Sequence, residues 1–115
     1  MRRKTFNDEV FLTDVVAITG TREETQAFLD KNDIEFDLGG DGYCGAFPNN
    51  RGFVVWLLHP DDFYVLMHEV LHLVVYIFNT KGININLANE EEVIAYYQSF
   101  WFRKLWRWFG GLKKK

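Results

Sequence analysis

The segment from Phe63 to Phe78 constrains the fold of this chain more than any other. It reads FYVLMHEVLHLVVYIF, and its only strongly polar residues are His68, Glu69 and His72. A helix that is apolar all round is a buried helix, so this run predicts a helix in the protein core. Burying two imidazoles and a carboxylate without partners is costly, and a bound metal ion would offset that cost.

The three polar residues form a His-Glu-x-x-His motif. Residues four apart lie on one face of a helix, so His68 and His72 can direct two ring nitrogens at one ion. Glu69 lies about 100° around the helix from His68, where it can reach a metal-bound water without ligating the metal. This is the arrangement of zinc peptidases, with two His ligands and Glu as general base. The alternative is two core histidines hydrogen-bonded to backbone, with Glu69 at the helix margin.

Composition and chain length predict one folded domain. The chain has 115 residues, of which 48% are apolar, which is enough for a single hydrophobic core. Cys44 is the only cysteine, so an internal disulfide and a cysteine zinc site are excluded, and we expect it to be a small buried residue and not a nucleophile. The N-terminal segment MRRKTFNDEV lacks the apolar stretch of a signal peptide, and the run ending at Phe78 is short for a membrane span.

Charge is distributed unevenly along the chain. Residues 5–102 hold 4 basic and 16 acidic residues, whereas residues 2–4 and 103–115 hold 3 and 6 basic residues and no acidic ones. The acidic body argues against a nucleic-acid groove at the active site. The basic ends are either solubilising tails or contacts for an acidic surface, a membrane or nucleic acid. We expect residues 1–109 to form the domain and residues 110–115 to form a flexible basic tail.

Turn residues, strand alternation and helix caps divide the chain into seven elements. We expect strands at 10–18, 34–38, 43–47 and 53–58, and helices at 21–30, 59–79 and 90–109. The order predicts an α+β fold, in which a small mixed or antiparallel sheet packs on the motif helix and a second long C-terminal helix. The strand at 53–58 leads directly into the motif helix, so we expect it to offer an edge to an extended peptide.

A catalytic zinc usually takes a third protein ligand. In metzincins that ligand is a His six residues after the motif, preceded by a Gly, but Val75 and Phe78 stand at these two positions. The other source is a Glu from the start of the last helix.

Among the acids that open the last helix, Glu92 is the preferred ligand. Glu92 to Ala95 matches the E-x-x-A pattern of Glu-ligand zincins, and a small Ala lets two helices approach. Glu91 is an alternative ligand. In a third interpretation Glu92 only caps the helix together with Asn89.

Three further features have both a functional and a structural interpretation. Tyr96 lies one turn after Glu92 and could donate a hydrogen bond to a developing oxyanion, or simply belong to the core. His59 could orient a substrate or face solvent. The aromatic and basic stretch 100–109 could dock on a membrane surface or a partner protein, or pack one face on the core.

HEVLHLVVYIF followed by EEVIAYYQSFWFRKL resembles a family of small phage-encoded putative metallopeptidases, over roughly residues 53–107. The resemblance implies a minimal gluzincin-like fold, one zinc ion bound by His68, His72 and Glu92, and Glu69 as the base. It also implies a viral source and a place in the host cytoplasm or the virion.

Two functions follow as expectations. The first is a zinc metallopeptidase acting on a peptide or protein, with Glu69 as the general base. The second is a phage structural or host-interaction protein that keeps a zincin scaffold and binds through its aromatic and basic C-terminus.

Overall fold

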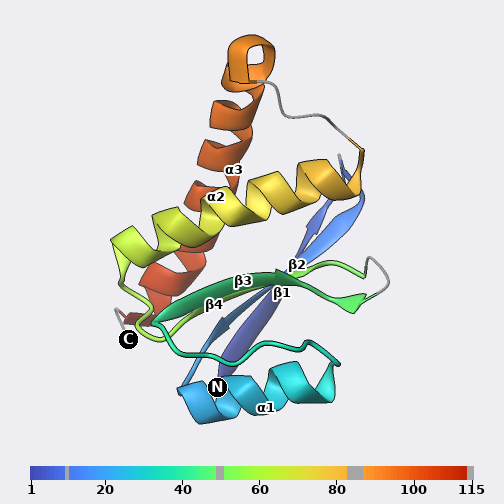
Figure 1. Ribbon diagram of the computed structural model, residues 1–115. Helices are drawn as coiled ribbons and strands as arrows, with labels where there is room; N and C mark the ends of the chain where they lie inside the picture. The colour runs from blue at the N-terminus through green and yellow to red at the C-terminus, as the bar shows by residue number, and fades with distance from the viewer. Residues whose placement is uncertain (10, 49–50, 83–86, 114–115) are drawn as a thin grey trace.

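Four strands form one mixed sheet in the computed structural model, which describes residues 1–9, 11–48, 51–82 and 87–113 (Figure 1). The strands are β1 (Arg2–Asp8), β2 (Thr13–Thr19), β3 (Gly42–Ala46) and β4 (Phe53–Leu57), in the order β1-β2-β4-β3. β2 and β4 are parallel, while β1 with β2 and β3 with β4 are antiparallel. β1 and β3 are therefore the edges of the sheet.

The helices cover both faces of this sheet, giving three layers. α1 (Arg22–Lys31) lies on one face, and α2 (Phe63–Thr80) and α3 (Leu87–Lys113) lie on the other (Figure 1). Strand alternation sends side chains to both layers, because successive residues point to opposite faces. In β4, for example, Val55 packs toward α2 and Trp56 packs toward α1. The α+β class with a small mixed sheet is thus confirmed.

Local capping determines where α1 and α2 begin. The Thr21 hydroxyl accepts from the Glu24 backbone N–H, and the Glu24 carboxylate accepts from the Thr21 backbone N–H, which is the predicted capping box. The Asp62 carboxylate accepts from the Val65 backbone N–H and opens α2. α2 ends at Thr80, one residue beyond the predicted end.

α3 is longer than predicted at both ends. It begins at Leu87, so Asn89 lies inside the helix and is not its N-cap, which removes the capping interpretation of Glu92. It also continues to Lys113, so the glycine pair at 110–111 does not end it at Phe109, and residues 110–113 are helical. Helical hydrogen bonding through the two glycines is compatible with their small intrinsic cost of about 1 kcal/mol each.

The alternating segment 34–38 is not a strand, contrary to the prediction. The Gln26 side chain replaces a neighbouring strand, because its Nε2 donates to the Phe36 carbonyl at 2.8 Å and its Oε1 accepts from the Leu38 N–H at 2.9 Å. The alternation of apolar and polar residues in this segment still reflects packing. Ile34 is buried in the apolar cluster between α1 and the sheet, and Leu38 packs against that cluster.

Two predictions about the sheet were also wrong. β1 was missed because its Arg2, Arg3 and Lys4 hide the strand pattern, although charged residues are typical of an edge strand. The strand predicted to offer an edge, 53–58, corresponds to β4, which is enclosed between β2 and β3. The free edge next to α2 belongs to β3.

α2 is a core helix on one side only. Leu66, Val70, Leu73 and Ile77 are fully buried, whereas Tyr64 is 83% exposed. By length and composition alone, its 18 residues also meet the requirements of a membrane span, and 39% of them are buried inside the protein. The prediction of a helix buried all round is therefore replaced by an amphipathic helix with one face on the sheet.

A buried hydrogen bond fastens α3 to the other edge of the sheet. The Tyr97 hydroxyl on α3 donates to the carboxylate of Asp8, which is 5% exposed at the end of β1. The Tyr97 ring also packs on Phe11 and Phe78, with ring centroids at 5.0 and 5.4 Å. Burial and this bond raise the pKa of Tyr97 above its usual range.

We predict that Tyr97→Phe lowers the free energy of unfolding by about 1.5–3 kcal/mol, the usual effect of removing a hydrogen bond to a charged group. Tyr96→Phe is the matched control, because the Tyr96 side chain is 71% exposed. Urea denaturation of both variants measures the difference. Equal stabilities would show that the hydroxyl of Tyr97 does not hold α3 on the sheet.

Candidate metal centre

The middle of α2 brings the three motif side chains together. His68 Nε2 and His72 Nε2 lie 3.1 Å apart, and the ligand atoms of His68, Glu69 and His72 all lie within 4.8 Å of one another. Their spacing along the helix produces this grouping, since positions i and i+4 share a face. These three side chains could hold a metal ion.

The three motif residues differ in solvent exposure, whereas all three were predicted to be buried. Glu69 is 8% exposed, but His68 is exposed and His72 is partly exposed. The imidazoles therefore do not need a metal to offset burial, and only the carboxylate is withdrawn from water. What supports a metal ion here is the convergence of the two nitrogens, and not a desolvation cost.

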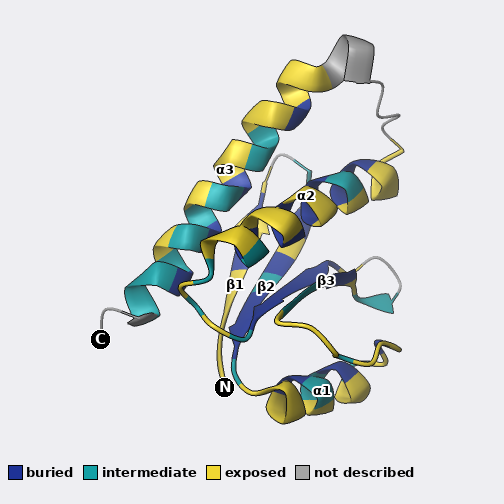
Figure 2. Cartoon of the chain, turned by 60° about the vertical axis from the view of Figure 1, so that its left-hand side comes forward, coloured by how far each residue is buried: buried dark blue, intermediate teal, exposed yellow. Residues whose placement is uncertain are grey.

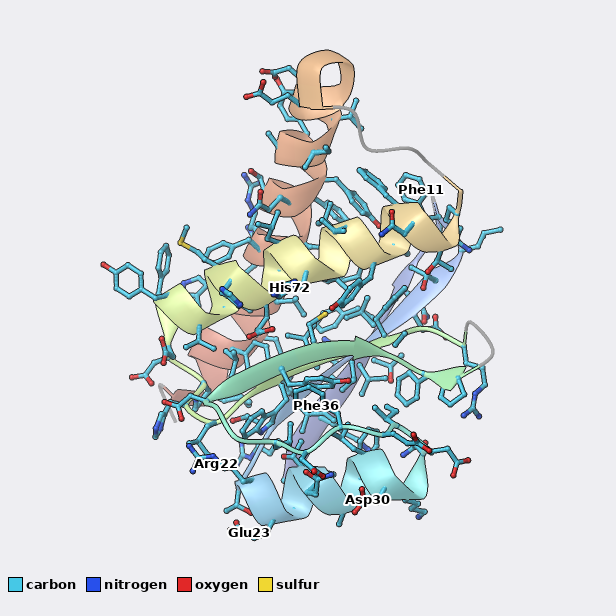
Figure 3. All side chains as sticks on the ribbon, in the orientation of Figure 1. Phe11, Arg22, Glu23, Asp30, Phe36 and His72 are labelled. Atoms are coloured by element: carbon cyan, nitrogen blue, oxygen red, sulfur yellow. The ribbon has the colours of Figure 1, made fainter. Side chains whose placement is uncertain are left out.

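A pocket of about 470 Å³ lies between the motif and β3. Its walls are the whole of β3 (Gly42–Ala46) and the motif residues, with Phe36 and Tyr76 at its sides. Figure 3 shows His72 on the α2 side of β3 and Phe36 on the α1 side. The pocket thus opens along the free edge of the sheet.

Small residues of β3 let the strand approach α2 closely. Gly42, Cys44 and Ala46 alternate toward α2, so the strand presents little side-chain volume to the helix. A Cβ built on Gly42 would lie 2.3 Å from Val65 Cγ1 and 3.2 Å from Glu69 Oε2. The absence of a side chain at Gly42 therefore leaves the space in which the Glu69 carboxylate lies.

Burial affects the acid–base properties of the pocket. It raises the pKa of Glu69, an effect that the nearby His68 and His72 oppose. Burial, with a smaller contribution from Glu69, also raises the pKa of Cys44, which is 6% exposed. Cys44 is thus a buried thiol, as predicted, and is poorly suited to nucleophilic attack. Burial likewise raises the pKa of Tyr43 to about 12, so its phenol stays protonated beside the pocket.

Sequence reasoning missed Tyr76 as a residue of the site. Its ring stacks on His72 with centroids 5.9 Å apart and planes 18° apart, and it stacks on Phe53 at 6.5 Å. Its spacing in the sequence could have identified it, because Tyr76 follows His72 by four residues and therefore lies on the same face of the helix. Tyr76 fixes one side of the His72 ring.

The remaining predicted residues lie outside this group. Glu91 and Glu92 are exposed in the first turns of α3, and neither belongs to the metal-holding group found among the described residues. Tyr96 is exposed on α3, and His59 is exposed before α2; neither lines the pocket. Figure 2 shows the N-terminal half of α3 largely exposed. The third ligand and the oxyanion donor therefore stay predictions.

Comparison with known proteins provides no parallel. No protein-family model, curated protein or solved structure matches the chain. The resemblance to phage metallopeptidases thus stays a prediction.

We predict that Gly42→Ala destabilises the fold by about 1–3 kcal/mol, the usual cost of overpacking, because the new methyl group collides with Val65. Gly39→Ala is the control, since a Cβ there meets nothing within 4 Å. Thermal melting compares the two variants. A Gly42→Ala protein as stable as the control would contradict the close approach of β3 to α2.

Proposed function

We propose that the pocket between α2 and β3 is a zinc site that hydrolyses peptide bonds. The observation that carries the proposal is the convergence of His68 Nε2 and His72 Nε2 beside the buried Glu69 carboxylate. Two nitrogens bound to a tetrahedral zinc at about 2.0–2.1 Å stand roughly 3.3 Å apart. The observed separation of 3.1 Å requires little movement to fit such an ion.

The donor set favours zinc over calcium and magnesium. Imidazole nitrogen is a preferred ligand of zinc, whereas calcium and magnesium prefer oxygen. When bound by His68 and His72, a zinc ion would polarise the scissile carbonyl and activate water. Glu92 remains the proposed third ligand, and its place would require a different position of the first turns of α3.

Glu69 has the properties of a general base. Its raised pKa brings the proton affinity of the carboxylate closer to neutrality, where a group can both accept and return a proton. In the proposed reaction Glu69 accepts a proton from the water that attacks the carbonyl carbon. It then gives this proton to the amine nitrogen as the peptide bond breaks.

The free edge of β3 supports a peptide as the substrate. In the part of the chain that the structure describes, β3 pairs with β4 alone, so its outer N–H and C=O groups are available to an extended chain along the pocket. The small residues facing α2 leave room for that chain next to His68 and His72. A bound peptide would form a fifth strand, with its backbone held across the motif.

A binding protein that keeps the scaffold is the second candidate. The position of Glu92 outside the metal-holding group favours it, because a catalytic zinc usually has three protein ligands. Zinc analysis and a Glu69 variant separate the two candidates.

We predict that the purified protein binds one zinc ion per chain and that His72→Ala abolishes stoichiometric binding and lowers the melting temperature. His59→Ala is the matched control, because His59 lies outside the metal-holding group. Elemental analysis measures zinc, and Glu92→Gln in the same series tests the third ligand. A zinc-free native protein, with His72→Ala as stable as wild type, would refute the zinc site.

We predict that Glu69→Gln retains zinc and folds normally but loses peptidase activity by a factor of about 10² to 10⁴, the usual contribution of general acid–base catalysis. Its stability should be equal or higher, because an amide costs less to bury than a carboxylate. Glu35→Gln on the surface is the control, and a quenched fluorescent peptide library gives the activity. Full activity or full biological function in Glu69→Gln would exclude the enzyme.

A further inference from the structure

One face of α3 has no packing partner in the described chain. Trp101, Leu105 and Phe109 on the inner face are fully buried. At 100° per residue, the opposite face carries Glu92, Tyr96, Ser99, Phe100, Arg103 and Arg107, and all six are exposed. We call these six residues the outer face of α3.

The outer face exposes aromatic side chains, which a helix in a folded protein would normally bury. Tyr96 is 71% exposed and Phe100 is 46% exposed, and Val93 at the margin is 57% exposed. Figure 2 shows the N-terminal half of α3 projecting beyond the rest of the protein. Large exposed apolar groups that are grouped on one face and bordered by charges are typical of a protein contact.

The charges of the outer face are separated along the helix. Glu92 lies toward its start, and Arg103 and Arg107 lie toward its end. Among the described residues the salt bridges are Met1 with Glu24 and Arg22 with Asp41, so these three charges have no salt-bridge partner in that part of the chain. Lys104 differs, because its Nζ lies 4.9 Å from the Phe100 ring centroid and 5.7 Å from that of Trp101.

We propose that this face joins two copies of the chain in a symmetric dimer, with α3 antiparallel to α3 of the second copy. A register centred between Ser99 and Phe100 places Glu92 opposite Arg107 of the second copy and Tyr96 opposite its Arg103. The two-fold axis repeats both pairs, as an isologous interface requires. The dimer thus gains two ion pairs and two guanidinium–aromatic contacts, and Ser99 and Phe100 of the two copies meet at its centre.

The pattern fits a second copy better than an anionic membrane. A membrane surface would attract Arg103 and Arg107 but repel Glu92 on the same face. In the antiparallel register the same residues are complementary, since Glu92 meets Arg107 and Arg103 meets the ring of Tyr96. A groove lined by Phe63, Met67, Phe102 and Trp106 lies beside this face and gives the second helix additional apolar surface.

The dimer does not depend on the proposed zinc chemistry. None of the six outer-face residues lines the pocket between α2 and β3. Glu92 is the one residue with two proposed roles, as a zinc ligand or as an ion-pair partner. Measuring zinc and mass on the same samples distinguishes them.

Sedimentation equilibrium of the full chain at low salt tests the proposal with charge reversals. Wild type should be a dimer, and Glu92→Arg and Arg107→Glu should each raise the dimer Kd by at least about tenfold, because like charges then face each other. The double variant Glu92→Arg/Arg107→Glu should restore the wild-type Kd. Glu23→Arg is the matched control, since it makes the same charge change on α1 in the opposite layer (Figure 3).

A cysteine cross-link gives a second readout that does not depend on charge. Ser99→Cys, next to the two-fold axis, should form a covalent dimer in air, whereas Asn79→Cys at the exposed end of α2 should not; native Cys44 is buried. A monomeric wild type, an unchanged Kd in both single reversals, or failure of the double variant to restore it would overturn the dimer. So would a Glu92→Arg protein that loses zinc but keeps the wild-type Kd.

Discussion

The contact between β3 and α2 determines the geometry of the pocket. Gly42 brings the strand against Val65 and Glu69, and this distance leaves no room for even one methyl group. The same contact withdraws the Glu69 carboxylate from water while His68 stays accessible. A wider spacing between β3 and α2 would admit water to the carboxylate. Packing and acid–base properties in this pocket therefore have one common cause.

The sequence predicted those features that depend on residues close together in the chain. The capping box of Thr21 and Glu24, the antiparallel pairing of β3 with β4, and the end of α2 all follow local patterns, although α2 begins at Phe63 and not at residue 59. The grouping of His68, Glu69 and His72 is of the same kind, because helical spacing alone brings them together. Three of the four strands and the centre of the candidate site were accessible in this way.

Features that depend on distant contacts were not accessible from the sequence. β1 is defined by its pairing with β2, and 34–38 is held by the Gln26 side chain instead of a strand. The path of α3 is determined by Tyr97 against Asp8 and by Trp101 against Phe6, at 6.4 Å between ring centroids. That path, and not any motif, decides how far the first turns of α3 lie from the imidazoles.

All walls of the pocket except Phe36 come from one uninterrupted stretch, Gly42 to Tyr76. This hairpin and helix form with short loop closures, whereas the parallel pairing of β2 with β4 spans a long intervening segment. The stretch that carries the chemistry is thus held by contacts between residues that are close in the sequence. It can become ordered early during folding, and completion of the sheet would then be the slower step that stabilises an already assembled site.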